Sequence, residues 1–411
     1  MGRDTRVSGF MVEDALSSGL LAGGAEVNRL TVVPTPVLAY LTRELKADAG
    51  VMITASHNPP QYNGIKIFDS EGIAYNWEKQ KRIEEIIGSE DFTLANWHDI
   101  KKSALCDGNA HYIRKIEQTV KLDKKWRVAV DPGCGAACYI APALLRRLGC
   151  KVTAINAQPD GFFPGRSSEP NAKSLERFAK IVKELGADMG VAYDGDGDRV
   201  AFVDEEGFFV DSDRLLAAYA GCIVKRNHGG AIVTNVEASM CVEKVVQTSG
   251  GEVVRTKVGD VYVAGAMKRH SAIFGGEPCG AWIHPQVHYC PDGILSSALL
   301  LRALEDEGET LTELVSEAPR YSTLRENIKC PDKLKSKVVS EFRKDSRSLF
   351  PSYKHVSTVD GVRLTVEEGW ILVRASGTEP VIRLTVEGES FKAAEEIMKR
   401  GVMLIKHLLG K

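Results

Sequence analysis

The feature that most constrains the fold of this chain is a plan that recurs three times along it. Each copy has an apolar helix, a turn that contains glycine, and a strand rich in β-branched residues. The copies occupy residues 20–27, 144–152 and 245–253. In each, the glycine stands where a helix needs a C-terminal cap, and the strand after it begins the next leg of a βαβ-like unit. This repeat predicts three structurally related α/β units with mixed sheets.

A second shared pattern follows each copy. A helix leads into a short apolar strand, and the strand opens into a polar loop near Ser56, Asp194 or Glu277. Loops at the carboxyl ends of strands are where α/β sheets place their chemistry. We therefore expect the functional side chains of the three units in these loops.

The last part of the chain has a different pattern, which indicates a small α+β domain. The predicted elements there are strands near 361–366, 370–374 and 381–387 and a helix from about 391 to 409. At 411 residues the chain exceeds the roughly 250–300 residues that one hydrophobic core serves. The predicted domains are 1–112, 113–212, 213–320 and 321–411.

Composition excludes several classes of protein. Lys and Arg number 53 against 55 Asp and Glu, so no net charge attracts nucleic acid or an anionic membrane. The nine cysteines lack both metal-ligand spacing and a disulfide framework, which favours a reducing compartment. No apolar run has the length of a membrane span, and residues 1–30 lack a signal-peptide core. We expect a cytoplasmic protein with no nucleic-acid or membrane partner.

The loop Asp194-Gly195-Asp196-Gly197-Asp198-Arg199 has three carboxylates at alternate positions, which can turn onto one hard cation. A solvated acidic turn is the plain alternative. A calcium EF-hand is a sharper one, because Glu205 falls at the twelfth position, but Arg199 stands where that loop needs glycine. So few ligands beside an arginine suit Mg²⁺, with Arg199 complementing a phosphoryl group.

The loop from Thr54 to Lys66 places Ser56 just past a strand, among polar and turn-forming residues. Ser56 is a candidate phosphoryl acceptor, with His57 or Lys66 moving protons or neutralising charge. A hydroxyl that only caps the turn is an equally good interpretation of this loop alone. The G-x-S-x-G pattern of acyl-transfer hydrolases is absent.

Two further loops carry polar groups. Arg374-Ala375-Ser376-Gly377-Thr378-Glu379-Pro380, with Arg383 beyond it, has the composition of a phosphate cradle, or of a polar hairpin with exposed arginine. Gly275-Gly276-Glu277-Pro278-Cys279-Gly280 holds a carboxylate in a tight turn that suits sugar hydroxyls. Cys279 has no basic neighbour in the loop to favour its thiolate.

Together, in this order, these loops and the segment Gly2-Arg3-Asp4-Thr5-Arg6-Val7-Ser8-Gly9 resemble the α-D-phosphohexomutase family, whose members interconvert 6-phospho and 1-phospho sugars. The resemblance implies four domains around a central cleft, a Ser56 that carries the phosphoryl group, and a bisphosphosugar intermediate and activator. It implies one Mg²⁺, a phosphosugar as small-molecule partner, and a monomer or homodimer. The implied metal ligands are Ser56, Asp194, Asp196 and Asp198. The implied catalytic residues are Ser56, Lys66, Arg199 and His57. The implied substrate-binding residues are Lys257, Glu277, Cys279, Arg374, Ser376, Gly377, Thr378 and Arg383.

Two departures from the family pattern matter. Family chains normally begin earlier, with a strand, an arginine-containing loop and a helix before the segment at Gly2, so the first domain is expected to be incomplete at its start. The sugar loop commonly has Ser where Cys279 stands and His where Ala281 stands, which leaves the sugar open.

Residues 156–161 and 360–362 are most similar to archaeal-type phosphoglucosamine mutases, which favours conversion of glucosamine 6-phosphate to glucosamine 1-phosphate. Phosphomannomutase/phosphoglucomutase activity is the nearest alternative. A phosphosugar phosphatase that uses the same serine and a truncated, non-catalytic phosphosugar-binding relative are further ones.

Overall fold

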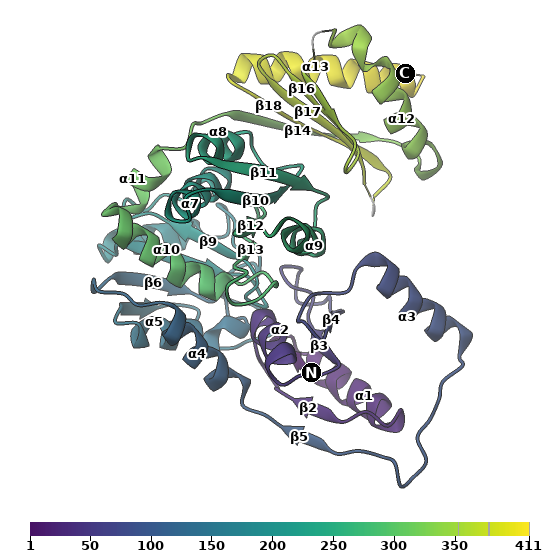
Figure 1. Cartoon of the computed structure of the whole chain (residues 1–411), viewed down its shortest axis with the longest axis vertical. Coiled ribbons are helices and arrows are strands. Elements are labelled where there is room, and N and C mark those ends of the chain that lie inside the picture. Colours follow the sequence, from purple (N-terminus) through teal and green to yellow (C-terminus); the bar gives the residue numbers. More distant parts are fainter. Residues whose placement is uncertain (352, 377–378, 411) are drawn as a thin grey trace.

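The computed structural model describes residues 1–351, 353–376 and 379–410, with the side chains of residues 348 and 349 left aside. Four α/β units follow one another around an arc, and the unit that contains the C-terminus lies at the opposite end from the one that contains the N-terminus (Figure 1). Within these described ranges, no helix combines the length and the apolar character that a bilayer crossing needs.

The first unit contains a three-stranded sheet in the order β1-β3-β4, with β1 parallel to β3 and β4 antiparallel to it. Its strands are β1 (Gly2–Arg3), β2 (Val27–Arg29), β3 (Ala49–Ile53), β4 (Ile65–Asp69) and β5 (Ser103–Leu105). Its helices are α1 (Gly9–Ala22), α2 (Thr35–Glu44) and α3 (Trp77–Ser89), and α4 (Gly108–Thr119) follows. Strands β2 and β5 pair separately, in parallel.

The second and third units repeat one topology, because their sheets have the orders β7-β6-β8-β9 and β11-β10-β12-β13, each closed by an antiparallel last strand. The second has β6 (Arg127–Asp131), β7 (Lys151–Ala154), β8 (Met189–Tyr193), β9 (Val200–Val203), the short 3₁₀ helix η1 (Ala136–Tyr139), α5 (Ala141–Arg147) and α6 (Glu176–Glu184). The third has β10 (Gly230–Asn235), β11 (Gly251–Thr256), β12 (Phe274–Gly276), β13 (Trp282–Ile283), α7 (Ser212–Arg226), α8 (Cys241–Thr248), α9 (Asp260–His270), α10 (Gly293–Glu307) and α11 (Leu311–Ser316).

The predicted repeat is therefore confirmed. Hairpins β3–β4, β8–β9 and β12–β13 occupy equivalent places, and each of their connections carries one of the polar loops singled out in the sequence. Glycines close the expected helix-to-strand turns: Gly24, Gly149 and Gly250 have positive φ angles, the left-handed backbone that glycine adopts without strain.

The fourth unit is an antiparallel sheet in the order β14-β18-β17-β16-β15 with two helices packed against it. Its elements are β14 (Ser322–Lys329), α12 (Asp332–Leu349), β15 (His355–Ser357), β16 (Val362–Val366), β17 (Gly369–Ala375), β18 (Val381–Gly388) and α13 (Phe391–Leu408). The α+β prediction is confirmed, although β14, α12 and β15 were not foreseen. Strand β14 is mostly exposed and polar, so its sequence lacks the run or alternation of apolar residues that predicts a strand.

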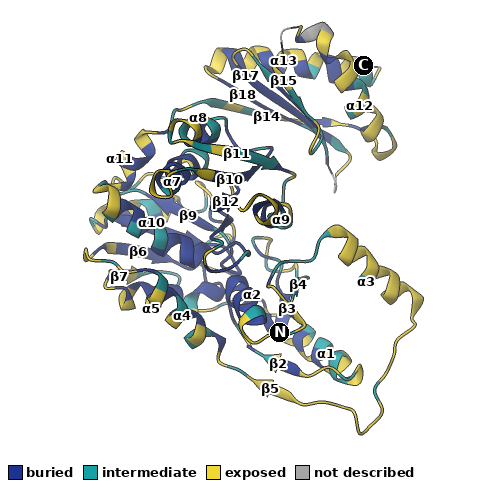
Figure 2. Ribbon diagram, in the orientation of Figure 1, coloured by how far each residue is buried: buried dark blue, intermediate teal, exposed yellow. Residues whose placement is uncertain are grey.

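The hydrophobic core is unevenly divided among the units. One continuous cluster runs from Leu30 to Ala318 and joins the first three units, whereas the fourth has a cluster of its own. Figure 2 shows the buried residues concentrated along these sheets, while α3 and the segment after it are exposed. The first three units are thus packed as one body, with the fourth attached to it. The predicted boundaries near 112, 212 and 320 stay predictions.

Candidate active site

The polar loops of the first three units meet at a cavity of about 950 Å³. Its lining includes Ser56, His57 and Lys66 from the first unit, Asp198 and Arg199 from the second, and Glu277 from the third. These loops share one place because each follows a strand that ends at the same side of its sheet. The loop neighbourhood predicted from the repeat is thereby present in three dimensions.

Ser56 follows β3 with a φ of 50°, a left-handed backbone that costs a non-glycine residue on the order of 1–3 kcal/mol. Its amide N–H donates to Thr54 Oγ1 at 2.8 Å, and its Oγ donates to Asp194 Oδ2 at 2.8 Å. Gly195 lies against it so closely that a Cβ there would stand 2.6 Å from the Ser56 carbonyl oxygen. The serine is therefore held by both units, with its hydroxyl turned toward the acidic loop.

His57 lies beside this hydroxyl, with Nδ1 3.4 Å from Ser56 Oγ. Burial and the positive charge of Arg199 lower the pKa of His57. The imidazole is therefore neutral near pH 7, with a ring nitrogen able to accept a proton.

Asp194, Asp196 and Asp198 are buried in the β8–β9 turn, and one carboxylate oxygen from each lies within 4.8 Å of the others. Asp194 Oδ1 closes the turn by accepting from the N–H groups of Gly197 and Arg199. Oδ1 of Asp196 and Oδ1 of Asp198 are buried without a hydrogen-bond partner within the described part of the chain. Such oxygens are costly unless a cation or a donor meets them, and a hard oxygen set of this kind fits Mg²⁺.

The carboxyl groups of this cluster have pKa values shifted in opposite directions. Burial alone would raise the pKa of Asp196, but Lys66 and the hydroxyl of Thr35 lower it to about 2. Burial and the charges of Asp196 and Asp198 raise the pKa of Asp194 well above its ordinary value. Lys66 Nζ donates to Oδ2 of Asp196 at 3.0 Å and of Asp198 at 2.7 Å, so an ammonium group neutralises part of the cluster. The remaining negative charge of the cluster lies next to the hydroxyl of Ser56.

Glu277 in the third loop is buried, and its Oε1 accepts from Asn235 Nδ2 at 2.7 Å and from the N–H of Gly259 at 2.8 Å. Burial raises the pKa of this carboxyl. Cys279 is exposed and lines the cavity. Two fixed hydrogen bonds orient Glu277 as an acceptor toward the cavity that it lines.

The structure does not bring every predicted residue to this cavity. Lys257 is exposed, lines a different hollow, and lies over the ring of Tyr262 with Nζ 5.6 Å from its centroid. Arg374 pairs with Glu237 and Asp360 at 3.1 Å each. These positions leave Lys257 and Arg374 outside the lining of the 950 Å³ cavity.

The rest of the fourth loop is described only in part. Ser376 is buried and its Oγ accepts from the N–H of Glu379, whereas Arg383 pairs with the Glu379 carboxylate at 2.8 Å. Gly377 and Thr378 lie outside the described residues. Lys335 on α12 donates to the carbonyl oxygens of Ser376 and Glu379 and so anchors both ends of the loop.

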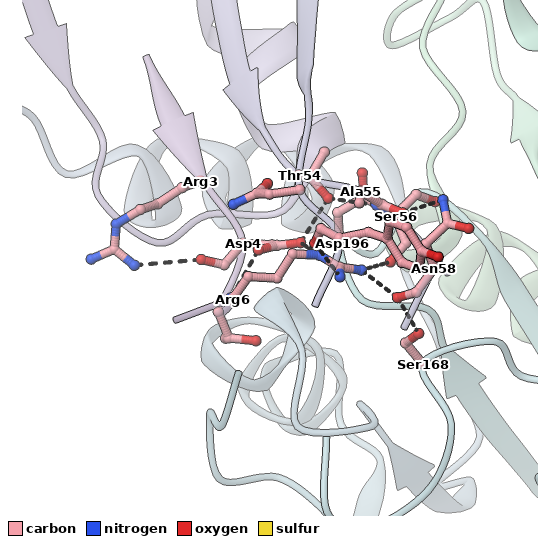
Figure 3. A network of polar contacts seen from close by, with 12 residues as sticks. Arg3, Asp4, Arg6, Thr54, Ala55, Ser56, Asn58, Ser168 and Asp196 are labelled. Carbon is pink, nitrogen blue, oxygen red and sulfur yellow. Dashed lines mark hydrogen bonds and ion pairs between the residues drawn. The ribbon is translucent and has the colours of Figure 1, made fainter. Parts of the chain in front are cut away.

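Several residues of the site were missed by the sequence reasoning. Asn235 ends β10, so the rule about carboxyl ends of strands would have found it. Arg6 and Asp4 follow β1 in the same way and lie beneath the Ser56 loop (Figure 3). Thr35, which donates to Asp196 Oδ2 at 2.6 Å, and Ser168 carry no signal in the sequence.

Comparison with known proteins follows the same division of the chain. Models of the phosphoglucomutase/phosphomannomutase family match in order: alpha/beta/alpha domain I at residues 1–94, domain II at 110–207, domain III at 211–321 and the C-terminal domain at 326–402.

Two archaeal relatives are similar over the whole chain. The "Probable phosphoglucosamine mutase" of Pyrococcus furiosus is 44% identical over 411 residues, which cover 100% of this chain and 90% of the relative. The phosphoglucosamine mutase of Methanocaldococcus jannaschii is 43% identical over 415 residues, covering 100% and 92%. Among solved structures, a phosphoglucomutase/phosphomannomutase family protein of Burkholderia thailandensis superposes with a TM-score of 0.90 at 28% identity, covering 99% of this chain and 88% of that one.

Proposed function

The chain belongs to the phosphoglucomutase/phosphomannomutase family and is a hexose phosphate mutase, and on that premise we propose that it converts glucosamine 6-phosphate to glucosamine 1-phosphate through Ser56. The observation that carries the role of Ser56 is the 2.8 Å hydrogen bond from its Oγ to Asp194 inside an acidic cluster, whereas the choice of glucosamine is supported by the two archaeal relatives. A hydroxyl that only capped a turn would bond to nearby main chain and not to a carboxylate 138 residues away.

The proposed cycle uses Ser56 as a phosphoryl carrier. In the first half, the P–O bond to Ser56 Oγ breaks as the C1 hydroxyl of the 6-phosphosugar takes the phosphoryl group, and the proton of that hydroxyl passes to the departing Ser56 Oγ. In the second half, the bisphosphosugar has turned around, its 6-phosphoryl group passes to Ser56 Oγ, and the proton of Ser56 goes to the C6 oxygen to leave the 1-phosphate. No phosphoryl group is lost over the cycle, so Ser56 ends it phosphorylated.

The residues around Ser56 suit the charge that moves. The transferring phosphoryl group spreads negative charge over its oxygens, so positioning and cationic stabilisation supply most of the catalysis. Lys66 and Arg199 line the cavity beside Ser56 and supply that positive charge. Neutral His57, with Nδ1 3.4 Å from Ser56 Oγ, is the proposed carrier that relays the proton between the sugar hydroxyl and Ser56 Oγ in each half of the cycle.

Asp194, Asp196 and Asp198 are the proposed ligands of Mg²⁺, together with an oxygen on Ser56. When bound there, Mg²⁺ supplies further neutralisation of phosphoryl oxygens. Two buried carboxylate oxygens without partners, in the described residues, support this assignment.

For the substrate, Glu277 is the proposed contact to sugar hydroxyls, since Asn235 and Gly259 orient its carboxylate at the cavity. Arg374, Ser376, Gly377, Thr378 and Arg383 are the proposed clamp for the phosphate that does not react, and Lys257 and Cys279 the proposed further contacts. For the clamp to act, Arg374 must leave its ion pairs with Glu237 and Asp360 and reach the cavity, whose lining already includes Arg325 of the fourth unit. A monomer or homodimer, without nucleic-acid or membrane partners, stays the expected state.

The first prediction is that Ser56→Ala abolishes mutase activity in the presence of Mg²⁺ and a bisphosphosugar, because no carrier remains. Intact-mass measurement of the wild type after incubation with the bisphosphosugar should find one added phosphoryl group, located at Ser56. Ser271→Ala is the matched control: Ser271 has a left-handed φ of 48° but lies at the end of α9, so this variant should keep full activity. Full turnover by Ser56→Ala would refute the mechanism.

Substrate choice is tested with the 6-phosphates of glucosamine, glucose, mannose and N-acetylglucosamine, scored for 1-phosphate product. Glucosamine 6-phosphate should give the highest kcat/KM. A preference for mannose or glucose would favour phosphomannomutase/phosphoglucomutase activity, and release of inorganic phosphate in step with substrate loss would indicate a phosphatase.

A further inference from the structure

Arg6 lies beneath the Ser56 loop, and its guanidinium group is completely buried (Figure 3). Nε donates to Asp4 Oδ2 at 2.9 Å, one terminal nitrogen to the carbonyl oxygens of Pro59 and Tyr62, and the other to those of Ser56 and Asn58 at 2.7 Å each. All five N–H donors of the arginine are therefore used. Four of the five hold main-chain carbonyl groups of the loop that carries the serine.

A second path connects Arg6 to the other side of Ser56. Asp4 accepts from the N–H of Arg6 through Oδ1 and from the hydroxyl of Thr54 through Oδ2, at 2.7 Å. Thr54 Oγ1 in turn accepts from the N–H of Ser56. The N–H and the C=O of Ser56 are thus both tied to the Asp4–Arg6 pair, which fixes the residue in its left-handed backbone.

The second unit completes the enclosure. Ser168 Oγ donates to the carbonyl oxygens of His57 at 2.7 Å and Asn58 at 3.0 Å. The ring of Phe163 stacks on Arg6, with the guanidinium carbon 5.2 Å from the ring centroid. The arginine therefore lies where the serine loop of one unit meets the second unit, whose next loop carries Asp194.

From this geometry we infer that Arg6 is a positioning residue for phosphoryl transfer: it sets the direction of Ser56 Oγ toward the acidic cluster. Arg6 is absent from the residues that line the cavity, so it acts through the loop and not on the substrate. By holding the Ser56 carbonyl, it also turns the N–H of the same trans peptide, that of His57, to the opposite side. The inference rests on the proposed role of Ser56 as phosphoryl carrier.

The chemistry of arginine is needed for this task. Lysine carries the same charge but only three donors on one nitrogen, without a planar fork. It would leave carbonyl groups of the loop unpaired, and the loop would shift. A displacement of about 1 Å at a reacting group lowers the rate by about a hundredfold.

The test compares Arg6→Lys, Arg6→Met and Arg214→Met as full chains. Arg214 is the matched control because it too donates to main-chain carbonyl oxygens, those of Val315 at 2.8 Å and Ala318 at 2.9 Å, in another part of the molecule. For both Arg6 variants we expect kcat to fall by about a hundredfold, KM for the 6-phosphosugar to stay within about twofold, and phosphorylation of Ser56 by the bisphosphosugar to slow in parallel. Arg214→Met should lower Tm while keeping kcat.

A purely structural role predicts a different result, namely a lower Tm for the Arg6 variants with wild-type kcat below that temperature. That result, or an equal loss of kcat in Arg214→Met, would overturn the inference. If the Arg6 variants fail to fold, Thr54→Val removes the hydroxyl that links Asp4 to the N–H of Ser56, at nearly constant side-chain size. It should lower kcat with KM unchanged, and wild-type kcat in this variant would also overturn the inference. Failure of the proposed function is separate: it appears as activity that survives Ser56→Ala, whatever the Arg6 variants do.

Discussion

At the scale of single residues, one carboxylate bears on the choice of sugar. Asp260, the first residue of α9, is half-buried, lines the cavity, and has no ion pair or side-chain hydrogen bond with any residue that the structure describes. The cavity also holds Glu277, which is already fixed by Asn235 and Gly259. A sugar that carries a protonated amine would gain a charge-assisted partner from Asp260, whereas a hydroxyl at the same carbon would gain less.

We therefore predict that Asp260→Asn lowers kcat/KM for glucosamine 6-phosphate by about tenfold more than for glucose 6-phosphate, since about 1.4 kcal/mol corresponds to a factor of ten. The two substrates are measured on the same preparation, so any general damage to the enzyme cancels. An equal fall for both substrates would mean that Asp260 does not contact the amine.

The residues that sequence reasoning found and missed differ in how they act. Ser56, Asp194 and Glu277 were predictable because each follows an apolar strand and brings its own reactive group. Arg6 also follows a strand, but its role was not foreseen, because its partners are main-chain oxygens 50 to 56 positions away and the residue type gives no information about such contacts. The position of Arg374 depends on how the fourth unit meets Glu237 of the third, and that of Lys257 on its contact with the ring of Tyr262, neither of which a local pattern encodes.

At the scale of elements, the repeat could be predicted because glycine caps and β-branched strands are local signals, whereas β14 could not, because its side chains are polar and exposed.

The hairpin β12–β13 leads into a buried histidine, His284, that no pattern in the sequence singles out. His284 contacts the rings of Tyr219 and Phe274, and its Nε2 lies 2.9 Å from Ser296 Oγ. Burial lowers the pKa of His284 to about 3 from an ordinary 6.5.

This histidine predicts how stability depends on pH. Between pH 6.5 and about 3, His284 binds a proton in the unfolded chain but stays neutral in the folded chain. The contribution of His284 is therefore complete above pH 6.5 and is lost as the pH falls, by up to about 1.4 kcal/mol per pH unit. The free energy of unfolding, measured with urea at a series of pH values, should fall less steeply with decreasing pH in His284→Gln than in the wild type. His407→Gln, at an exposed position of α13, is the control. Identical slopes for His284→Gln and the wild type would contradict the assignment.

At the scale of the whole molecule, the segment from α3 to β5 stands away from the shared core (Figures 1 and 2). Helix α3 has no buried residue, and the exposed fractions of Leu94 and Trp97 are 71% and 86%. Among the strands that the structure describes, β5 pairs with β2 alone. A segment with so few buried contacts opens at low cost.

Limited chymotrypsin digestion should therefore cut first between residues 90 and 102, after Phe92, Leu94 or Trp97. The two fragments should stay associated on gel filtration, because α4 and β2 remain packed in the body. A first cut in the connection between α11 and β14, near residues 317–321, would show instead that the fourth unit is the least protected part.

The glycines at the interfaces between the first three units limit which of these units can be exchanged by recombination. Gly195 lies against Ser56, and Gly293 against Arg199, where a Cβ would stand 2.7 Å from a carbonyl oxygen. Main chain fits against main chain there, with no side chain to absorb a mismatch. Recombination that exchanged one of these units for that of a distant relative would leave a gap or a steric clash at the interface next to Ser56. The three units are therefore expected to be inherited together, whereas the fourth, which has its own main core and a smaller apolar contact with the third through Val236, Trp370 and Leu372, is expected to be exchanged more readily.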